Sequence, residues 1–596
     1  MTHPARGRAA RAAVAGIAVA FGLAHPAPAP AADSQAVGAT PTLTQPDSPT
    51  KPPPEHFLNA VQATRIAARS PKLQAELAKH DRTTNRAFAK GPGRWQVSWY
   101  DKGKEIGQVI VDERTERAVE VWTGPQAAWQ MARGLPGAFG RKVNSPLVWI
   151  PMMVAFFLPF FDWRRPLRLL HLDLLVLLAF SFSHVFFNRG EIDTSVPLVY
   201  PVLGYLLARM LWVAYARRSR PPRPLRLLVP VSWLALGLIF LVGFRIGLNV
   251  TNSNVIDVGY SGVIGADRIT HGKELYGDFP SSDPSGDTYG PVNYYAYVPF
   301  ELAFPWSGRW DDLPAAHAAA LFFDVATIVA LLWLGRRLRR GPGGNVLGVL
   351  LAYGWASYPY TLFVSNSNAN DSLIALLVVL SFGALSAPRA RGALLALAAA
   401  AKFAPLALAP LFASYDGDSG RRTQRNTERS RLRNAALFAV AFAAVTVVVY
   451  APVLPDGGVS ALWDRTVGFQ LGRDSPFSIW GQHPSLDWLQ SVAKVAAAAL
   501  ACLVAFVPRR KTPLQLAALG AAVLIALQLT MTHWFYLYIV WWFPLAFVAL
   551  ILPLVPGSAR SNSQAPDDPT SLDIPSPRGP RPPSRSAPAS ASGTAG

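Results

Sequence analysis

One polar stretch between two apolar runs holds the residues best suited to chemistry. Residues 249–314 contain Asp257 within Asn-Val-Ile-Asp-Val-Gly-Tyr and are rich in carboxylates, glycines and tyrosines. Such a long water-exposed loop is usually functional. Asp257 comes shortly after the apolar run 227–248, so its carboxylate is expected at a membrane surface, where it can take a proton from a sugar hydroxyl as a general base. On the pattern alone, an ordinary solvated carboxylate is the alternative.

Further candidate site residues can supply positive charge or hydrogen-bond donors. They are Lys402, Arg245, Arg473 and His533, and in a low-dielectric site such groups stabilise an anion. Lys402 lies at a helix break, because Pro405 follows it. Arg245 could instead be a snorkelling arginine, Arg473 a solvated loop charge and His533 a helix-end residue.

Amide and aromatic side chains supply further candidate binding contacts. They are Asn366, Asn368, Asn370, Asp371, Tyr289 and Tyr260. Amides offer both donors and acceptors to hydroxyl groups, although helix capping by Asp371 or Ser372 is a competing explanation. Asp324 lies within an apolar run, where ionisable groups mark polar cavities, and Arg245 is a candidate partner for it.

Metal and cofactor sites lack a sequence signature. The acidic residues Asp278, Asp283 and Asp287 are spaced unlike any defined cation-binding loop. The sequence has no Walker loop, no Rossmann glycine fingerprint and no His-Glu-x-x-His. We therefore expect no cofactor and assign no metal.

The bulk composition is that of a membrane protein. The chain has 596 residues, of which 51% are hydrophobic and 15% charged, and its mean hydropathy is +0.22, whereas soluble proteins carry about 25% charged residues. Eleven apolar runs are long enough to be spans. They are 145–161, 169–187, 195–215, 227–248, 315–335, 343–363, 372–386, 435–454, 491–507, 513–530 and 534–555.

The net charge of +20 is concentrated in the short loops between these runs. That is the positive-inside pattern of cytoplasmic loops and argues against nucleic-acid binding. A single crossing at 392–414 would place a basic loop on the wrong side. We therefore predict a hairpin of two short helices broken at Lys402-Phe-Ala-Pro405, because irregular backbone at depth is tolerated inside protein. The single Cys502 excludes an intramolecular disulfide.

The chain divides into six segments. The first is a signal peptide, 1–32, with basic, apolar and small-residue parts in order. The rest are a linker, 33–55; an exported domain, 56–143; a three-helix membrane extension, 145–215; a membrane core, 225–555; and a disordered cytoplasmic tail, 556–596. In the exported domain, Arg94-Trp-Gln-Val-Ser-Trp-Tyr and two later stretches alternate like strands. It resembles PepSY-type domains and is a candidate lid, scaffold or protein-partner module.

The polar motifs of the membrane core follow an order typical of one enzyme family. Ile256-Asp257-Val-Gly-Tyr260, Gly272-Lys-Glu-Leu-Tyr276, Tyr289-Gly-Pro291 and Tyr297-Val-Pro299 come first. Ser365-Asn-Ser-Asn-Ala-Asn-Asp371, Lys402-Phe-Ala-Pro405 and His533-Trp-Phe-Tyr-Leu-Tyr follow. This order resembles the GT-C membrane glycosyltransferases, especially glycosyltransferase family 87, although the family's Gly-Gln before the polar Asn turn is absent.

The resemblance implies an all-α polytopic membrane protein of GT-C type, with about 11 spans plus a broken helical hairpin, behind a small N-terminal α+β extracytoplasmic domain. It also implies inverting transfer of a hexose, mannose above all, from a polyprenyl-phosphate sugar donor to a lipid or polysaccharide acceptor. Asp257 would be the base, on the extracytoplasmic side of the plasma membrane. The four cationic or donor residues named above would then bind the departing donor phosphate, and the amide, acidic and tyrosine residues would contact the sugar or the acceptor. The alternatives are a transporter or flippase of lipid-linked sugars, which would use charges such as Asp324, and a non-catalytic scaffold, for which Asp257 is dispensable.

Overall fold

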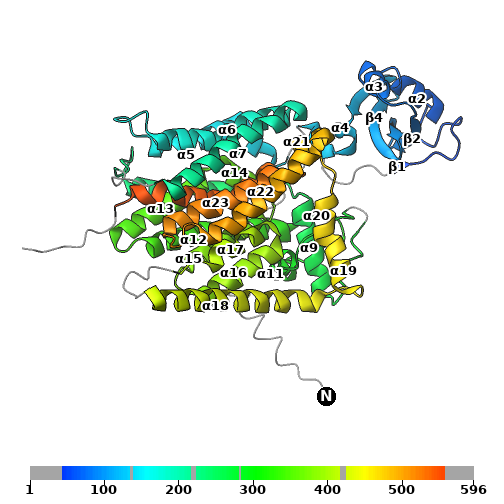
Figure 1. Ribbon diagram of the computed structural model, residues 1–596. Coiled ribbons are helices and arrows are strands. Elements are labelled where there is room, and N and C mark those ends of the chain that lie inside the picture. The colour runs from blue at the N-terminus through cyan, green and yellow to red at the C-terminus, as the bar shows by residue number, and fades with distance from the viewer. Residues whose placement is uncertain (1–42, 135–138, 217–222, 281–282, 417–423, 557–596) are drawn as a thin grey trace, which may run out of the picture. The chain divides into compact units, whose positions relative to one another are not determined.

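The computed structural model describes residues 43–134, 139–216, 223–280, 283–416 and 424–556 (Figure 1). The predicted signal peptide at 1–32, the first part of the linker and the tail from 557 onward lie outside these described residues.

Helices make up most of the described chain, which is a helical membrane protein with a small N-terminal sheet domain. Eight segments are long and apolar enough to cross a membrane among the described residues. Their helices are α6 (Leu169–Asn188), α7 (Ile192–Tyr215), α8 (Val231–Thr251), α12 (Pro314–Leu338), α18 (Gln424–Tyr450), α22 (Asp487–Phe506), α23 (Pro513–Thr530) and α24 (Ile539–Ile551). In Figure 1, α6, α7, α18, α22 and α23 run from side to side of the view.

Three further predicted spans are shorter helices. The run 145–161 forms α5 (Pro146–Phe157), and the run 372–386 forms α15 (Asp371–Gly383). The run 343–363 is not one helix but two, α13 (Pro342–Ser357) and α14 (Pro359–Asn366). Pro359 separates them, because proline cannot donate the backbone hydrogen bond that would continue a helix.

The broken hairpin is confirmed. Helix α16 (Pro388–Ala401) ends at Lys402, whose backbone is extended at φ −139° and ψ 141°. A 3₁₀ turn and α17 (Ala409–Ala413) then lead back. Arg391, near the start of α16, donates from Nη2 to the carbonyl oxygen of Tyr415 at 2.8 Å. The two ends of the segment therefore meet, and Lys402 lies at its turning point.

The stretch 249–314 is packed protein rather than the solvated loop that its composition predicts. It contains α9 (Asp257–Thr270), α10 (Val292–Tyr295) and α11 (Val298–Ala303). Every residue of α9 from Val258 to Asp267 is buried. A Cβ on Gly262 or Gly265 would lie 2.6 Å from the ring of Tyr297 or 2.1 Å from that of Tyr294. Both tyrosines are fully buried, so their rings pack on glycine backbone instead of forming an interfacial belt.

The N-terminal sheet has five antiparallel strands in sequence order: β1 (Leu43–Thr44), β2 (Thr84–Lys90), β3 (Arg94–Asp101), β4 (Lys104–Asp112) and β5 (Arg117–Thr123). Helices α2 (Ala60–Ala67) and α3 (Pro71–Leu77) pack on it, and Trp95, Val97 and Trp99 of β3 lie in the shared core. The three strands expected from alternation are confirmed. Alternation alone did not predict β2, which is mostly polar.

Candidate active site

Charged side chains from five separate segments meet around the beginnings of α9 and α15. We call this group the charged cluster: Asp257, Asp371, Lys402, Arg473 and His533. The carboxyl of Asp257 interacts electrostatically with Arg473, Lys402 and Asp371, and the ring of His533 with Arg473 and Lys402. All five residues were selected from the sequence, and the fold brings them together.

Lys402 and Asp371 form a buried ion pair within the charged cluster. Lys402 Nζ lies 2.7 Å from Asp371 Oδ1, and the two side chains are 8% and 0% exposed. Trp541 Nε1 donates to the same oxygen at 2.7 Å. The ammonium also lies 5.5–5.7 Å from the ring centroids of Tyr289, Tyr538 and Trp541. Cation–π attraction strengthens in such a desolvated setting, so these rings help to hold the charge.

The capping interpretation of Asp371 is wrong. The N-cap of α15 is Asn370, which makes no side-chain cap hydrogen bond, and Asp371 is the first helical residue. Among the described residues, Asp371 Oδ2, both side-chain polar atoms of Asn370 and the hydroxyl of Ser372 are buried without a hydrogen-bond partner. Buried polar atoms are normally satisfied. A ligand with several hydroxyl groups would satisfy these.

The side chain of Asp257 is reachable from solvent but is surrounded by protein. Its side chain is exposed, yet burial by the surrounding protein raises the pKa of its carboxyl, against the opposing effects of the Val258 N–H, Arg473 and Lys402. The Val258 N–H donates to Oδ1 at 2.9 Å and fixes the carboxylate at the start of α9, where the helix dipole favours negative charge. An accessible carboxylate with a raised pKa has the properties of a general base.

Arg473 and His533 differ in charge. Arg473 lies 5.1 Å from the ring of Trp129, and His533 Nδ1 lies 2.8 Å from Ser475 Oγ. Burial, together with Arg473 and Lys402, lowers the pKa of His533 well below its usual value. The imidazole is therefore neutral at pH 7. His533 was selected to supply positive charge or a hydrogen-bond donor, and a neutral imidazole can act here only as a hydrogen-bonding group.

Trp129 is a site residue that the sequence did not reveal. It follows α4 (Pro125–Ala128), in the stretch assigned to the exported domain 56–143. Its ring centroid lies 5.9 Å from that of His533. Gln126 Nε2 donates to the carbonyl oxygen of Gly190 at 2.9 Å and so ties this stretch to the membrane helices. No pattern in the sequence distinguishes this tryptophan, which lies in a polar segment, as a site residue.

A buried carboxyl interacts electrostatically with that of Asp257. Asp283 is 7% exposed, and its Oδ2 accepts a hydrogen bond from Ser261 Oγ at 2.6 Å. Burial, with a contribution from the charges of Asp257 and Asp287, raises the pKa of Asp283 to about 6. Asp287 is paired with Arg465, whose Nη1 lies 2.8 Å from Oδ2.

The raised pKa of Asp283 predicts a pH-dependent stability. The fold favours the protonated carboxyl, so this contribution to stability is present below about pH 4 and is lost as pH rises through about 6. Asp283→Asn should therefore raise the free energy of unfolding relative to wild type at about pH 7.5, by at most about 3 kcal/mol, and leave it unchanged at about pH 4. Asp278→Asn is the matched control, because that side chain is 90% exposed. An equal difference at both pH values would contradict the prediction.

Asn366 and Asn368 position the backbone before Asp257 through their amide N–H groups, and Oδ1 of Asn366 is buried without a hydrogen-bond partner in the described part of the chain. Asn366 Nδ2 donates to the carbonyl oxygen of Asn252 at 2.8 Å, and Asn368 Nδ2 donates to that of Asn254 at 3.0 Å. Both side chains are fully buried. Their N–H groups thus have a structural role, and the expected contact with a sugar stays a prediction. The backbone of Asn368 has φ 49°, a left-handed conformation that asparagine tolerates.

Two other selected tyrosines have different surroundings. Tyr289 is half-buried, and its ring is one of those beside Lys402. Tyr260 is 1% exposed and stacks on Trp310 with ring centroids 4.4 Å apart. The ring of Tyr260 thus has a packing role, and its predicted contact with sugar or acceptor stays a prediction.

Arg245 is neutralised by a carboxylate and does not join the charged cluster. Its Nη2 lies 2.5 Å from Asp324 Oδ1, and both side chains are buried. Trp355 Nε1 donates to the same oxygen at 2.8 Å. The partnership of Arg245 with Asp324 is confirmed, whereas the expected contact of Arg245 with a donor phosphate is not supported.

Breaking this pair is expected to destabilise the fold. Arg245→Met should lower the free energy of unfolding by about 3 kcal/mol, because it leaves Asp324 charged and buried. Adding Asp324→Asn should recover most of the loss, since the amide oxygen still accepts the hydrogen bond of Trp355. Unfolding midpoints of the purified proteins in detergent measure both effects. A double variant as unstable as the single one would show that the cost is not an unpaired charge.

Within the described ranges, no group of three or more His, Cys, Asp or Glu side chains is placed to hold a metal ion. In comparisons with known proteins, no family model matches the chain and no curated protein sequence matches it.

Proposed function

We propose that the chain is a membrane glycosyltransferase of GT-C type. It transfers a hexose, mannose above all, from a polyprenyl-phosphate donor to a lipid or polysaccharide acceptor on the extracytoplasmic side of the plasma membrane. The observation that carries the proposal is the charged cluster. It sets the accessible carboxylate of Asp257 beside Arg473 and Lys402 at the ends of apolar helices.

The residues of the cluster divide the work of an inverting transfer. Asp257 takes the proton of the acceptor hydroxyl, whose oxygen bonds to the anomeric carbon as the bond from that carbon to the phosphate oxygen breaks. The polyprenyl phosphate departs with the bonding electrons and needs positive charge beside it. Arg473 is the principal candidate, because no ion pair involves it among the described residues, whereas Lys402 is paired with Asp371.

Unpartnered polar atoms support a place for the sugar at the start of α15. The side chain of Asn370, Oδ2 of Asp371 and the hydroxyl of Ser372 are buried without partners among the described residues. Each such atom left unsatisfied costs about 1–3 kcal/mol. Sugar hydroxyls, which donate and accept, would satisfy amide, carboxylate and hydroxyl groups together.

The transporter alternative receives less support from the buried charges. A carrier needs ionisable groups in the membrane that can engage its cargo or a coupling ion. Asp324 is paired with Arg245, and Asp173 with Arg209 at 2.8 Å. Both carboxylates are thus occupied by arginines of neighbouring helices.

Donor preference tests the proposal. Membranes containing the chain are incubated with labelled polyprenyl-phosphate-mannose or with a labelled nucleotide-mannose, and label in lipid and polysaccharide is measured. Matched membranes that lack the chain are the control. Chain-dependent incorporation from the lipid donor is expected. Incorporation from the nucleotide donor alone, or no dependence on the chain, would overturn the proposal.

A further inference from the structure

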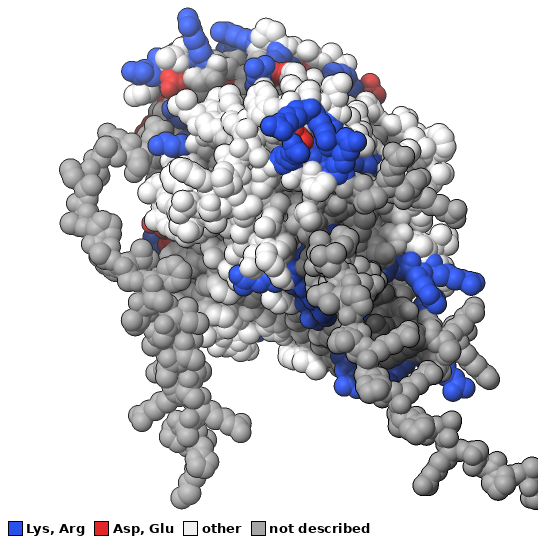
Figure 2. Space-filling model, turned by 90° about the vertical axis from the view of Figure 1, so that its left-hand side faces the viewer, with Lys and Arg blue, Asp and Glu red and all other residues white. Residues whose placement is uncertain are grey.

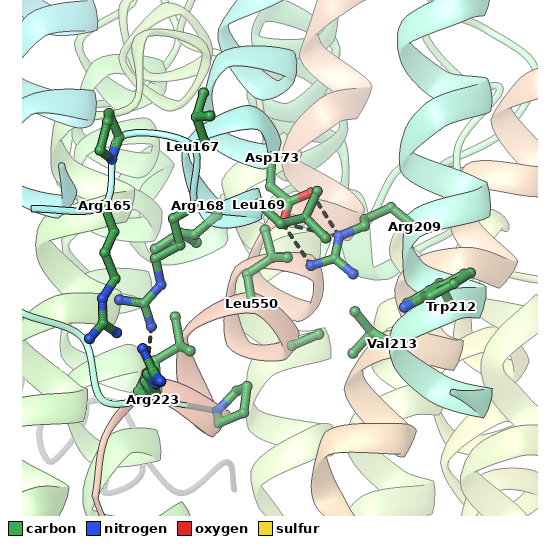
Figure 3. Close-up of a pocket in the computed structure, with 15 residues that line it drawn as sticks. Arg165, Leu167, Arg168, Leu169, Asp173, Arg209, Trp212, Val213, Arg223 and Leu550 are labelled. Atoms are coloured by element: carbon green, nitrogen blue, oxygen red, sulfur yellow. Dashed lines mark hydrogen bonds and ion pairs between the residues drawn. The ribbon is translucent and has the colours of Figure 1, made fainter. Parts of the chain in front are cut away.

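A pocket at the start of α6 lies apart from the charged cluster. The pocket has a volume of about 680 Å³ and opens between the start of α6 and the ends of α7 and α24 (Figure 3). That volume is in the range of small-molecule and lipid sites. None of the residues of the charged cluster lines it.

The walls of the pocket are apolar and open to the surroundings. Leu169 and Trp212 are 48% and 65% exposed, and Leu167 is 100% exposed. Leu550 and Leu554 of the C-terminal helical segment complete the apolar lining. Because these side chains belong to the ends of membrane helices, they are suited to contact with an acyl chain.

Arginines gather on one side of this lining. Arg168 is fixed by donating to the carbonyl oxygens of Arg223 at 2.5 Å and Pro224 at 3.3 Å. No ion pair involves Arg165 or Arg223 within the part of the chain that the structure describes, whereas Arg168 lies 3.7 Å from a carboxylate oxygen. Figure 3 shows the guanidinium groups of Arg165, Arg168 and Arg223 grouped together. The face of the molecule that is on the left in Figure 1 carries many Lys and Arg and few Asp and Glu (Figure 2).

The remaining charges of the pocket cancel each other. Arg209 Nε lies 2.8 Å from Asp173 Oδ1, and Tyr205 donates its hydroxyl to the same oxygen at 2.8 Å. The positive charge available to a ligand is therefore mainly that of Arg165 and Arg223, because Arg168 shares its charge with a carboxylate.

We propose that this pocket binds an anionic phospholipid. The phosphodiester lies at Arg165, Arg168 and Arg223, and an acyl chain follows Leu169 and Trp212. A basic pocket between membrane helices is a known way to bind anionic headgroups. A free phosphate would leave the apolar walls exposed, and the ammonium of a zwitterionic headgroup would be repelled by the arginines. The inference does not depend on the proposed glycosyl transfer.

Native mass spectrometry of the full-length protein in detergent micelles tests the inference. The probes are phosphatidylglycerol and phosphatidylcholine with identical acyl chains. Phosphatidylglycerol should bind more tightly. The double variant Arg165→Gln/Arg223→Gln should weaken its binding roughly thirtyfold, since each arginine near an anionic surface contributes about a fivefold factor. Equal binding of the two lipids, or no effect of the double variant, would overturn the proposal.

Two controls separate this site from general surface charge. Arg164 is exposed and lies in the same connection, but it does not line the pocket, so Arg164→Gln should leave phosphatidylglycerol binding unchanged. An equal loss in that variant would mean that the lipid binds the basic face without a defined site. Inorganic phosphate in excess should not displace the lipid; displacement would assign the pocket to a free anion instead.

Discussion

Replacing Asp257 by Asn is expected to lower sugar transfer by about a thousandfold, within the range that a general base contributes. The substitution keeps the size of the side chain, and the amide oxygen can still accept the hydrogen bond that the Val258 N–H gives to Oδ1 at 2.9 Å. Only the capacity to take the acceptor proton is removed. Initial rates with labelled polyprenyl-phosphate-mannose, at saturating donor, measure the effect.

The control for this variant is Asp278→Asn, which removes an exposed carboxylate from the same stretch of chain. It should transfer sugar at the wild-type rate. The unfolding midpoint of Asp257→Asn should not fall, because burial already disfavours the charged carboxylate. A folded Asp257→Asn protein that retains transfer near the wild-type rate would remove Asp257 from the mechanism.

Lys402→Met is expected to combine a large loss of transfer with a loss of stability. Nζ lies 2.7 Å from Asp371 Oδ1 in a buried pair, so the unpaired carboxylate should lower the free energy of unfolding by about 3–5 kcal/mol. Removing a positive charge from the site of the departing phosphate should also slow transfer by about a hundredfold to a thousandfold.

The double variant Lys402→Met/Asp371→Asn separates these two effects. It removes both charges, and the amide oxygen can still accept the hydrogen bond from Trp541 Nε1. Its unfolding midpoint should return toward the wild-type value, while transfer stays low. Recovery of transfer together with stability would mean that Lys402 acts only by holding Asp371.

The membrane helices could be predicted because hydropathy and length determine them locally. The break at Lys402 was also predictable, since Pro405 and the sign of the neighbouring loops both required it. The burial of α9 was not. Its sequence, with Gly262 and Gly265, resembles a loop, and its helix depends on the tyrosine rings that fill the space left by those glycines.

The sequence predicted at which end of the membrane helices the site residues lie, but not which side chains they contact. Residues at helix ends on the same side lie at one height, which is why Asp257, Lys402 and His533 could be grouped in advance. Arg245 met the same criterion, yet a carboxylate one helix away neutralises it. Its partner depends on which helix faces are adjacent, and no local pattern encodes that. Trp129 was missed for the same reason, because it comes from a segment outside the membrane core.

The fate of the bond between sugar and phosphate tests the central claim most directly. Purified wild-type protein in lipid vesicles is given an acceptor extract and polyprenyl-phosphate-mannose labelled separately in the sugar and in the phosphate. We expect the two labels to separate, with the sugar label in the acceptor and the phosphate label on the polyprenyl lipid. Labels that stay joined while the donor crosses the bilayer would identify a transporter and contradict glycosyl transfer.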